Sequence, residues 1–263
     1  MIDFSTIFSP LISMIVQNWY FIPIILIIFI FRTPFGKGLI GEMLINFAVN
    51  IRLDKDKYHL IKNVTLPTED GTTQIDHIVV SEFGIFVIET KNMRGWIFGG
   101  EKQKTWTQKI YKFSTKFQNP LHQNYKHAKT IESTLDIDPN KIFSVVVFVG
   151  DSTFKTEMPK NVTYAGGLID YIRSKTEKIL SQKEVEKIIS MIESGRLSRT
   201  LKTHREHVKH VKNIVKEKEN QNSCPKCGSE LILRVAKQGV NKGNEFYGCS
   251  SYPKCRHTAL ANI

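Results

Sequence analysis

Two carboxylates and a lysine occupy positions where the sequence predicts β-strands. Asp76 lies within the apolar run 74–80, and Glu89 and Lys91 end the run 84–91. Alternate residues of a strand face the same side, so Glu89 and Lys91 project together, and a hairpin between the two strands would bring Asp76 beside them. Two carboxylates can bind a hard divalent cation such as Mg²⁺ or Mn²⁺, and a lysine can orient water or neutralise phosphate charge. This pattern is typical of phosphodiester hydrolysis.

The alternative is that these three residues are ordinary surface charges, because their spacing also arises by chance. The surrounding sequence favours the catalytic interpretation. Glu89 follows the apolar run Gly84-Ile85-Phe86-Val87-Ile88, and a charge at the end of a buried strand is costly unless it has a use. Glu42, on a predicted helix, is a candidate further metal ligand or orienting group.

All four cysteines lie in the last 40 residues, as two close pairs, Cys224 with Cys227 and Cys249 with Cys255. A 21-residue gap separates the pairs. This is the spacing of a tetrahedral structural zinc site, with one Zn²⁺ per chain. Two disulfides are the main alternative and a redox pair a further one, but a cytoplasmic location disfavours disulfides.

The elements that must position these residues follow from hydrophobic periodicity. The expected fold class is α/β, in the order helix, three strands, helix, strand, helix. Helices are predicted at 39–53, at 120–135 and from a capping box at Ser181 and Glu184; strands are predicted at 58–66, 74–80, 84–91 and 142–149. Residues 36–38 are expected to form a flexible glycine-containing exit, and 96–98 and 105–107 to continue the sheet.

Several histidines and tryptophans receive plainer interpretations. His77 alternates to the face opposite Asp76, which predicts packing or support of the site. His122 and His127 are interpreted as polar helix-face residues rather than metal ligands. Trp96 and Trp106 are interpreted as core or sheet-edge residues, with base stacking the less favoured role.

Residues 11–31 carry no charge, and about 20 apolar residues span a bilayer. We therefore expect a single transmembrane helix in the cell membrane, with 11–31 as the membrane contact. A cleaved signal peptide and a buried core helix are the alternatives. Asp3 precedes the segment while Arg32 and Lys37 follow it, which places the bulk of the chain, 32–263, in the cytoplasm.

The net charge of +12 indicates an anionic partner. Residues 196–263 contribute nine of the twelve charges, and 196–222 has apolar residues at helical spacing, which predicts a basic helical linker.

The residues around the carboxylates carry a resemblance. Gly41-Glu42, Gln74-Ile75-Asp76-His77-Ile78-Val79-Val80, Gly84 to Lys91, Gly95-Trp96-Ile97, Trp106 and Asn119-Pro120-Leu121-x-Gln123 resemble the nuclease-related domain known as NERD, over about 37–150. That family is grouped with the PD-(D/E)xK nucleases, whose restriction-endonuclease-like core has the order αβββαβ. The resemblance implies that Asp76 and Glu89 match the metal-binding positions and Lys91 a catalytic one. It also implies supporting catalytic positions for Glu42 and Gln123.

The cysteine region, over about 223–260, resembles the C-terminal C4 zinc fingers of type IA DNA topoisomerases. The shared residues are Cys224-Pro225-x-Cys227-Gly228 and Phe246-x-Gly248-Cys249-Ser250-x-Tyr252-Pro253-x-Cys255. The resemblance implies binding of single-stranded DNA. Phe246 and Tyr252 are then candidates for base stacking, or for packing around the zinc, and the expected phosphate contacts are Arg234, Lys237, Lys242, Lys254 and Arg256.

The sequence thus predicts four parts: a transmembrane anchor (1–35), a nuclease-like domain (36–195), a basic helical linker (196–222) and a DNA-binding zinc finger (223–263). The expected function is a membrane-anchored, metal-dependent deoxyribonuclease. A membrane-anchored DNA tether without catalytic activity is one alternative, and an RNA-processing nuclease is another.

Overall fold

The computed structural model describes residues 17–68, 71–197, 224–236, 238 and 243–260. The chain forms two compact units, Met1–Leu197 and Ser198–Ile263. Most of the expected helical linker, the first part of the expected membrane segment, and both Lys237 and Lys242 lie outside the described residues.

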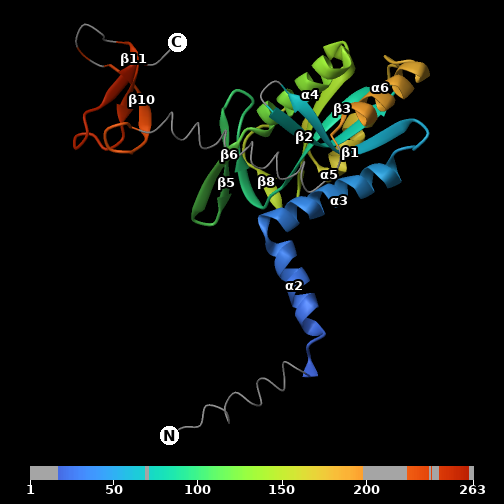
Figure 1. Cartoon of the computed structure of the whole chain (residues 1–263), viewed down its shortest axis with the longest axis horizontal. Coiled ribbons are helices and arrows are strands. Elements are labelled where there is room, and N and C mark those ends of the chain that lie inside the picture. Colours follow the sequence, from blue (N-terminus) through green and yellow to red (C-terminus); the bar gives the residue numbers. More distant parts are fainter. Residues whose placement is uncertain (1–16, 69–70, 198–223, 237, 239–242, 261–263) are drawn as a thin grey trace. The chain divides into compact units, whose positions relative to one another are not determined.

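The first unit is built on a mixed sheet of five strands (Figure 1), in the order β1 (Tyr58–Thr68), β2 (Gly71–Ser81), β3 (Gly84–Asn92), β7 (Ile142–Val149) and β9 (Val162–Tyr164). Strands β1, β2 and β3 pair in antiparallel fashion, and β7 is parallel to both β3 and β9. Strand β3 therefore has a partner on each side. Its residues 84–89 are all buried, as expected for a near-continuous apolar run.

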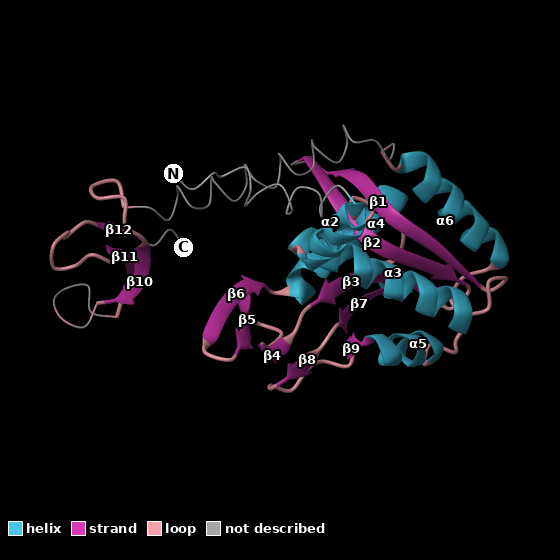
Figure 2. Ribbon diagram, turned by 90° about the horizontal axis from the view of Figure 1, so that it is seen from below, coloured by secondary structure: helices cyan, strands magenta, loops and turns pink. Residues whose placement is uncertain are grey.

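Two pairs of helices cover the two faces of this sheet (Figure 2). Helices α4 (Pro120–Leu135) and α6 (Gln182–Gly195) pack on one face through side chains such as Ile131 and Ile192. Helices α3 (Pro34–Arg52) and α5 (Ala165–Arg173) pack on the other through Ile45, Val49 and Leu168. The expected order of helix, three strands, helix, strand and helix is present as α3, β1–β3, α4, β7 and α6.

Residues 96–98 and 105–107 do not continue the main sheet, contrary to expectation. They belong to a second sheet of four strands, in the order β6 (Phe113–Gln118), β5 (Thr105–Ile110), β4 (Gly95–Phe98) and β8 (Ser152–Phe154). The chain turns out of β3 at Gly95, whose φ of +77° suits glycine and whose added Cβ would lie 2.5 Å from the Lys109 carbonyl oxygen. Trp106 is fully buried in this region, whereas Trp96 is 47% exposed, with Lys155 Nζ 4.8 Å from its ring centroid.

Helix α2 (Phe21–Arg32) precedes α3 and meets it at an angle of 82°. Among the described residues, no single helix is long and apolar enough to cross a membrane, although α2 and α3 taken together meet that length and composition. The expected flexible exit at 36–38 is instead the first turn of α3, because the Thr33 side chain accepts from the Gly36 N–H and Pro34 occupies the first helical position.

The second unit contains a three-stranded antiparallel sheet, in the order β10 (Leu231–Val235), β11 (Glu245–Cys249) and β12 (Thr258–Leu260). Strand β10 lies between the two cysteine pairs, and β11 ends at Cys249.

Candidate active site and zinc centre

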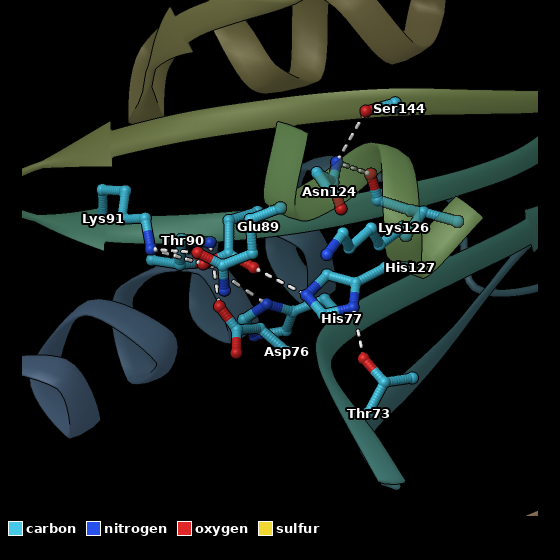
Figure 3. Close-up of polar contacts among 12 residues, drawn as sticks. Thr73, Asp76, His77, Glu89, Thr90, Lys91, Asn124, Lys126, His127 and Ser144 are labelled. Atoms are coloured by element: carbon cyan, nitrogen blue, oxygen red, sulfur yellow. Dashed lines mark hydrogen bonds and ion pairs between the residues drawn. The ribbon is translucent and has the colours of Figure 1, made fainter. Parts of the chain in front are cut away.

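Strands β2 and β3 bring Asp76 and Glu89 together in the middle of the main sheet. The antiparallel register pairs His77 with Ile88, so the residues immediately beyond that pair are Asp76 and Glu89. Asp76 Oδ2 accepts a hydrogen bond from the Thr90 N–H at 2.9 Å. Figure 3 shows the two carboxylates next to each other, with Lys91 beside them. The structure thus assembles the three residues that the sequence singled out.

Glu89 lies at the centre of this group and is only 3% exposed. Its Oε1 lies 2.7 Å from Lys91 Nζ, and its Oε2 lies 3.3 Å from His127 Nε2. His127 in turn has Nδ1 2.8 Å from Thr73 Oγ1 (Figure 3). Glu89 therefore lies between a lysine of its own strand and a histidine of α4, and the Oε2–Nε2 contact with the histidine lacks hydrogen-bond geometry.

Helix α4 also positions Lys91. The Lys91 ammonium donates to Gln123 Oε1 at 2.9 Å. The start of α4 is fixed by Asn119, whose Oδ1 accepts from the Leu121 N–H and whose Nδ2 donates to the carbonyls of Gly100, Glu101 and Gln103. The supporting position that the sequence assigned to Gln123 is thus in contact with the catalytic candidate Lys91.

The electrostatics of the two central carboxylates differ. Burial, together with the negative charge of Glu89, raises the pKa of Asp76 to about 8, against the lowering effect of the Thr90 N–H. Burial acts to raise the pKa of Glu89 as well, but the neighbouring His127 and Lys91 outweigh it and hold that pKa below its usual range. Asp76 therefore takes up a proton readily in the absence of a cation, while Glu89 stays ionised.

Glu42 of α3 interacts electrostatically with Asp76 and Glu89. Burial raises its pKa, and the charge of Glu89 raises it further, while a hydrogen bond with Asn63 acts to lower it. Glu42 also contributes to the raised pKa of Asp76. The negative charge of Glu89 thus disfavours ionisation of both Asp76 and Glu42, and a divalent cation would offset that repulsion.

His77 is fully buried on the face of β2 that α3 covers, as its alternation with Asp76 predicted. Burial lowers the pKa of His77 to about 4, so its ring is neutral at physiological pH. Its Nδ1 lies 3.4 Å from Thr90 Oγ1, and Thr90 is the residue whose N–H binds Asp76. His77 thus packs behind the site and supports it through Thr90.

Two residues of α4 have a part in the site that the sequence interpretation did not assign to them. His127 was interpreted as a polar helix-face residue, and its face is the buried one: it is 6% exposed and contacts Glu89, whereas His122 is exposed. The sequence pattern indicates this burial, because His127 shares a helix face with Ile131 and Leu135, which are both buried. Asn124 is fully buried, and its Nδ2 donates to the carbonyl oxygens of Val87 and Val145. It therefore joins α4 to β3 and β7 beneath the site.

The four cysteines of the second unit converge on one point. Their sulfur atoms all lie within 4.8 Å of one another, and none forms a disulfide. Cys224 and Cys249 are buried, and Gly228 adopts a φ of +73°, which turns the chain tightly after the first pair. Four thiolates in this arrangement fit one tetrahedral Zn²⁺. The two-disulfide alternative is thereby disfavoured.

In the described parts of the chain, no other group of three or more His, Cys, Asp or Glu side chains has its ligand atoms this close. Asp76 and Glu89 of the first unit carry carboxylate oxygens, the type of ligand that Mg²⁺ accepts in proteins.

A hollow of about 290 Å³ lies beside the zinc ligands Cys249 and Cys255. It is lined by Arg234, Phe246, Tyr252 and Arg256, among others. Tyr252 is 60% exposed, with the Arg234 guanidinium 6.0 Å from its ring centroid, while Phe246 is half-buried. The structure thus gathers four of the expected DNA-contacting side chains at one place, and the exposed Lys254 follows Tyr252 closely in sequence.

Comparison with known proteins identifies two modules in the chain. Residues 37–149 match the family model of the nuclease-related domain, and residues 221–262 match that of the topoisomerase DNA-binding C4 zinc finger. The second match extends to DNA topoisomerase 1 of Methanocaldococcus jannaschii, which is 48% identical over 48 residues, or 18% of this chain and 6% of that protein. The uncharacterized protein YrdD of Escherichia coli is 53% identical over 36 residues, or 14% of this chain and 17% of YrdD.

A longer match is to an uncharacterized protein of Bacillus anthracis, which is 42% identical over 166 residues. This alignment covers 61% of this chain and 77% of the relative. The chain therefore belongs to the same family as the Bacillus anthracis protein, and it combines a nuclease-related domain with a topoisomerase-type C4 zinc finger.

Proposed function

We propose that this protein is a metal-dependent nuclease that hydrolyses phosphodiester bonds in DNA and holds its substrate with the zinc finger. The observation that carries the proposal is the group formed by Asp76, Glu89 and Lys91. The two carboxylates lie side by side on neighbouring strands, and the Lys91 ammonium lies within hydrogen-bonding distance of Glu89. The match of residues 37–149 to the nuclease-related domain supports this interpretation.

The donor set fits Mg²⁺ or Mn²⁺. Asp76 and Glu89 would bind the ion through carboxylate oxygens, and the cation would offset the repulsion that raises the pKa of Asp76. Glu42 interacts electrostatically with both carboxylates and is available as a further direct or water-mediated ligand. When bound, such an ion polarises a phosphoryl oxygen and lowers the pKa of a bound water.

Other groups of the chain orient the metal ligands, the attacking water and the phosphate. The Thr90 N–H engages Asp76 Oδ2, which fixes the direction of the other oxygen. Lys91 is 22% exposed at its side chain, so its ammonium reaches the surface between Glu89 and Gln123. From there it can orient an attacking water or stabilise charge on the phosphate in the transition state. His127 and Gln123 keep these two groups in place.

The zinc finger supplies the contact with DNA in this proposal. Arg234 and Arg256 border the hollow beside the zinc ligands, and Tyr252 exposes its ring there. A base stacked on Tyr252 with phosphates on the arginines is the mode used by proteins that bind single-stranded DNA. Zn²⁺ itself is structural, since four cysteine ligands leave no open position.

The protein is further proposed to be anchored in the cell membrane by its N-terminal segment, with the bulk of the chain in the cytoplasm. The support is the uncharged run 11–31, followed by basic Arg32 and Lys37. Helix α2, which covers most of the described part of this run, exposes large apolar side chains, including Phe29 at 69% and Ile25 at 64%.

The deciding experiment is a cleavage assay on the full-length, zinc-loaded protein in detergent. Single-stranded DNA, double-stranded DNA and RNA are each incubated with the protein in the presence of added Mg²⁺ or Mn²⁺. In the control, the protein is first dialysed without a chelator, which removes loosely bound Mg²⁺ or Mn²⁺ and retains the zinc. We expect metal-dependent cleavage of DNA that is lost in the Asp76→Ala variant. DNA binding without cleavage in any divalent metal would identify a DNA tether instead, and cleavage of RNA alone would identify an RNA-processing nuclease.

A further inference from the structure

Helix α3 has two apolar faces, and only one of them is covered. Ile45 and Val49 lie on the inner face and are buried against the main sheet. The outer side carries large apolar residues at intervals of four, so each lies about 40° further round the helix than the one before, in a row that winds along it. These residues are between 42% and 68% exposed: Phe35, Leu39, Met43, Phe47 and Ile51. We call this row the outer stripe of α3.

The charges on α3 do not interrupt the outer stripe. The helix has one acidic residue, Glu42, which is half-buried and interacts electrostatically with Glu89. Its basic residues, Lys37 and Arg52, stand near the two ends. Large apolar side chains that a helix leaves exposed, with basic residues near its ends, can be buried at the boundary between lipid headgroups and acyl chains.

The corner between α2 and α3 fixes the direction of the outer stripe. Gly36 packs so closely against the end of α2 that an added Cβ would clash with the Ile30 carbonyl oxygen. The Thr33 hydroxyl donates to the same carbonyl and accepts from the Gly36 N–H. Gly36 lies on the outer side of α3, about 180° around the helix from Ile45 at about 100° per residue. Helix α2 therefore leaves α3 at 82° and on the side away from the sheet (Figure 1).

The hairpin between β5 and β6 lies next to the corner between α2 and α3. A hollow of about 340 Å³ is lined by Pro34 and Lys37 at the corner and by Gln108 and Ile110 of β5. The turn that follows exposes Tyr111 at 93% and Phe113 at 69%, and Lys112 lies between them in sequence. Aromatic side chains next to a lysine suit the boundary between lipid and water, where rings insert and ammonium groups reach the headgroups.

We propose that the outer stripe of α3 lies on the membrane surface as an interfacial helix, while α2 enters the bilayer nearly at right angles to it. The inference rests on the membrane anchoring proposed above and adds a second, in-plane contact. The uncharged run 11–31 ends at this corner, so the chain that precedes α3 matches the lipid environment that the outer stripe would face. The hairpin turn would touch the same headgroup layer.

This arrangement gives the active site a set position relative to the membrane. Glu42, which interacts with the carboxylates of the site, lies on the same helix as the outer stripe, and a helix with side chains is about 10–12 Å across. The carboxylates would therefore be held on the order of one helix diameter from the lipid surface. DNA would be cleaved only where it runs close to the membrane.

The test uses the full-length protein with the photoreactive residue benzoylphenylalanine at one position. Phe47 is the test position and Tyr125 is the matched control, because Tyr125 is an aromatic residue on α4, on the opposite face of the sheet, and is 59% exposed. Each variant is reconstituted with vesicles of phosphatidylcholine and phosphatidylglycerol, recovered by flotation and irradiated. We expect lipid adducts at position 47 in at least tenfold excess over position 125.

The alternative outcomes separate the two proposals. Flotation without lipid adducts at position 47, confirmed with the reporter at Met43, would overturn the interfacial helix and leave the anchor intact. A crosslink to a second copy of the chain would overturn it in favour of a dimer contact. Failure of the wild-type chain to float would remove the anchor and the interfacial helix together. A DNA adduct from a reporter at Phe113 would assign the hairpin to nucleic acid and exclude it from the membrane surface.

Discussion

The His127 ring connects two strands of the main sheet, with Nε2 3.3 Å from Glu89 Oε2 on β3 and Nδ1 2.8 Å from Thr73 Oγ1 on β2. A histidine held in this way orients the carboxylate without itself binding the proposed cation. Groups that orient metal ligands typically contribute 10–100-fold to metal affinity or activity.

We therefore expect His127→Ala to weaken Mn²⁺ binding and to lower kcat by about 10–100-fold. Isothermal titration calorimetry and a cleavage assay measure the two quantities. His122→Ala is the control, because His122 lies on the same helix but is exposed. Equal effects of the two substitutions would show that His127 has no special part in orienting Glu89.

Substitution of the three central residues separates the proposed roles. Asp76→Ala and Glu89→Ala should abolish cleavage, because each removes an oxygen ligand. Lys91→Ala should retain metal binding and lose about 10²–10⁴-fold in rate. DNA affinity, measured by fluorescence anisotropy, should stay near the wild-type value in all three. Full activity of Asp76→Ala, or loss of DNA binding in a folded variant, would contradict this assignment.

The raised pKa of Asp76 predicts a pH-dependent metal affinity. A cation competes with the proton on Asp76, so the apparent Mg²⁺ affinity should rise about tenfold per pH unit below pH 8 and level off above it. For the metal-free protein, a rise in pH has the opposite effect on stability, because it lowers the stability of the folded state. The pKa of Asp76 is higher in the folded state than in the unfolded state, so its contribution to stability is present at low pH and is lost as pH rises through about 8.

Asp76→Asn is the corresponding test variant. Without metal it should melt at a higher temperature than wild type at pH 8–9, and each kcal/mol would shift Tm by about 2–4 °C. The same variant should show no stabilisation by Mg²⁺. A pH-independent Mg²⁺ affinity between pH 6 and 8 would show that no protonated carboxyl must ionise for the metal to bind.

Loss of zinc should unfold the second unit alone. Cys249→Ser removes a buried ligand, and metal binding supplies much of the folding free energy of so small a module. Amide hydrogen exchange should show loss of protection in 224–260 and unchanged protection in 58–149. Elemental analysis should give one zinc per wild-type chain. Retention of protection in 224–260 in a zinc-free variant would contradict the structural role.

The hollow beside the zinc site should govern DNA affinity. Tyr252→Ala should weaken binding of single-stranded DNA by about 1–3 kcal/mol, as expected for the loss of one stacked base. Arg234→Ala should also weaken binding and should reduce its dependence on salt, since it removes a phosphate contact. Tyr111→Ala is a matched control, because that tyrosine is exposed in the first unit. Equal losses from Tyr252→Ala and Tyr111→Ala would reject the hollow as the DNA site.

The parts of the site that the sequence predicted are those whose signals are local. The cysteine spacing sets the zinc geometry directly, and the alternation of β2 and β3 is enough to bring Asp76 and Glu89 together. The contact between His127 and Glu89 joins residues 38 positions apart, so it depends on how α4 packs across the sheet. The second sheet was missed because β6 and β8 are short and partly polar, with no alternation that distinguishes them from loops.

Strand β3 is hydrogen-bonded along both of its edges, which protects it when the domain unfolds locally. Proteins unfold locally from their least protected segments, and a strand paired on both sides is among the last to open. The amide protons of Val87, Ile88 and Glu89 should exchange with solvent more slowly than those of β1 and β9, which lie at the ends of the sheet order. Local unfolding of those outer strands would leave Glu89 and Lys91 in register. The edges of the sheet could therefore unfold and refold while the proposed catalytic residues stay in place.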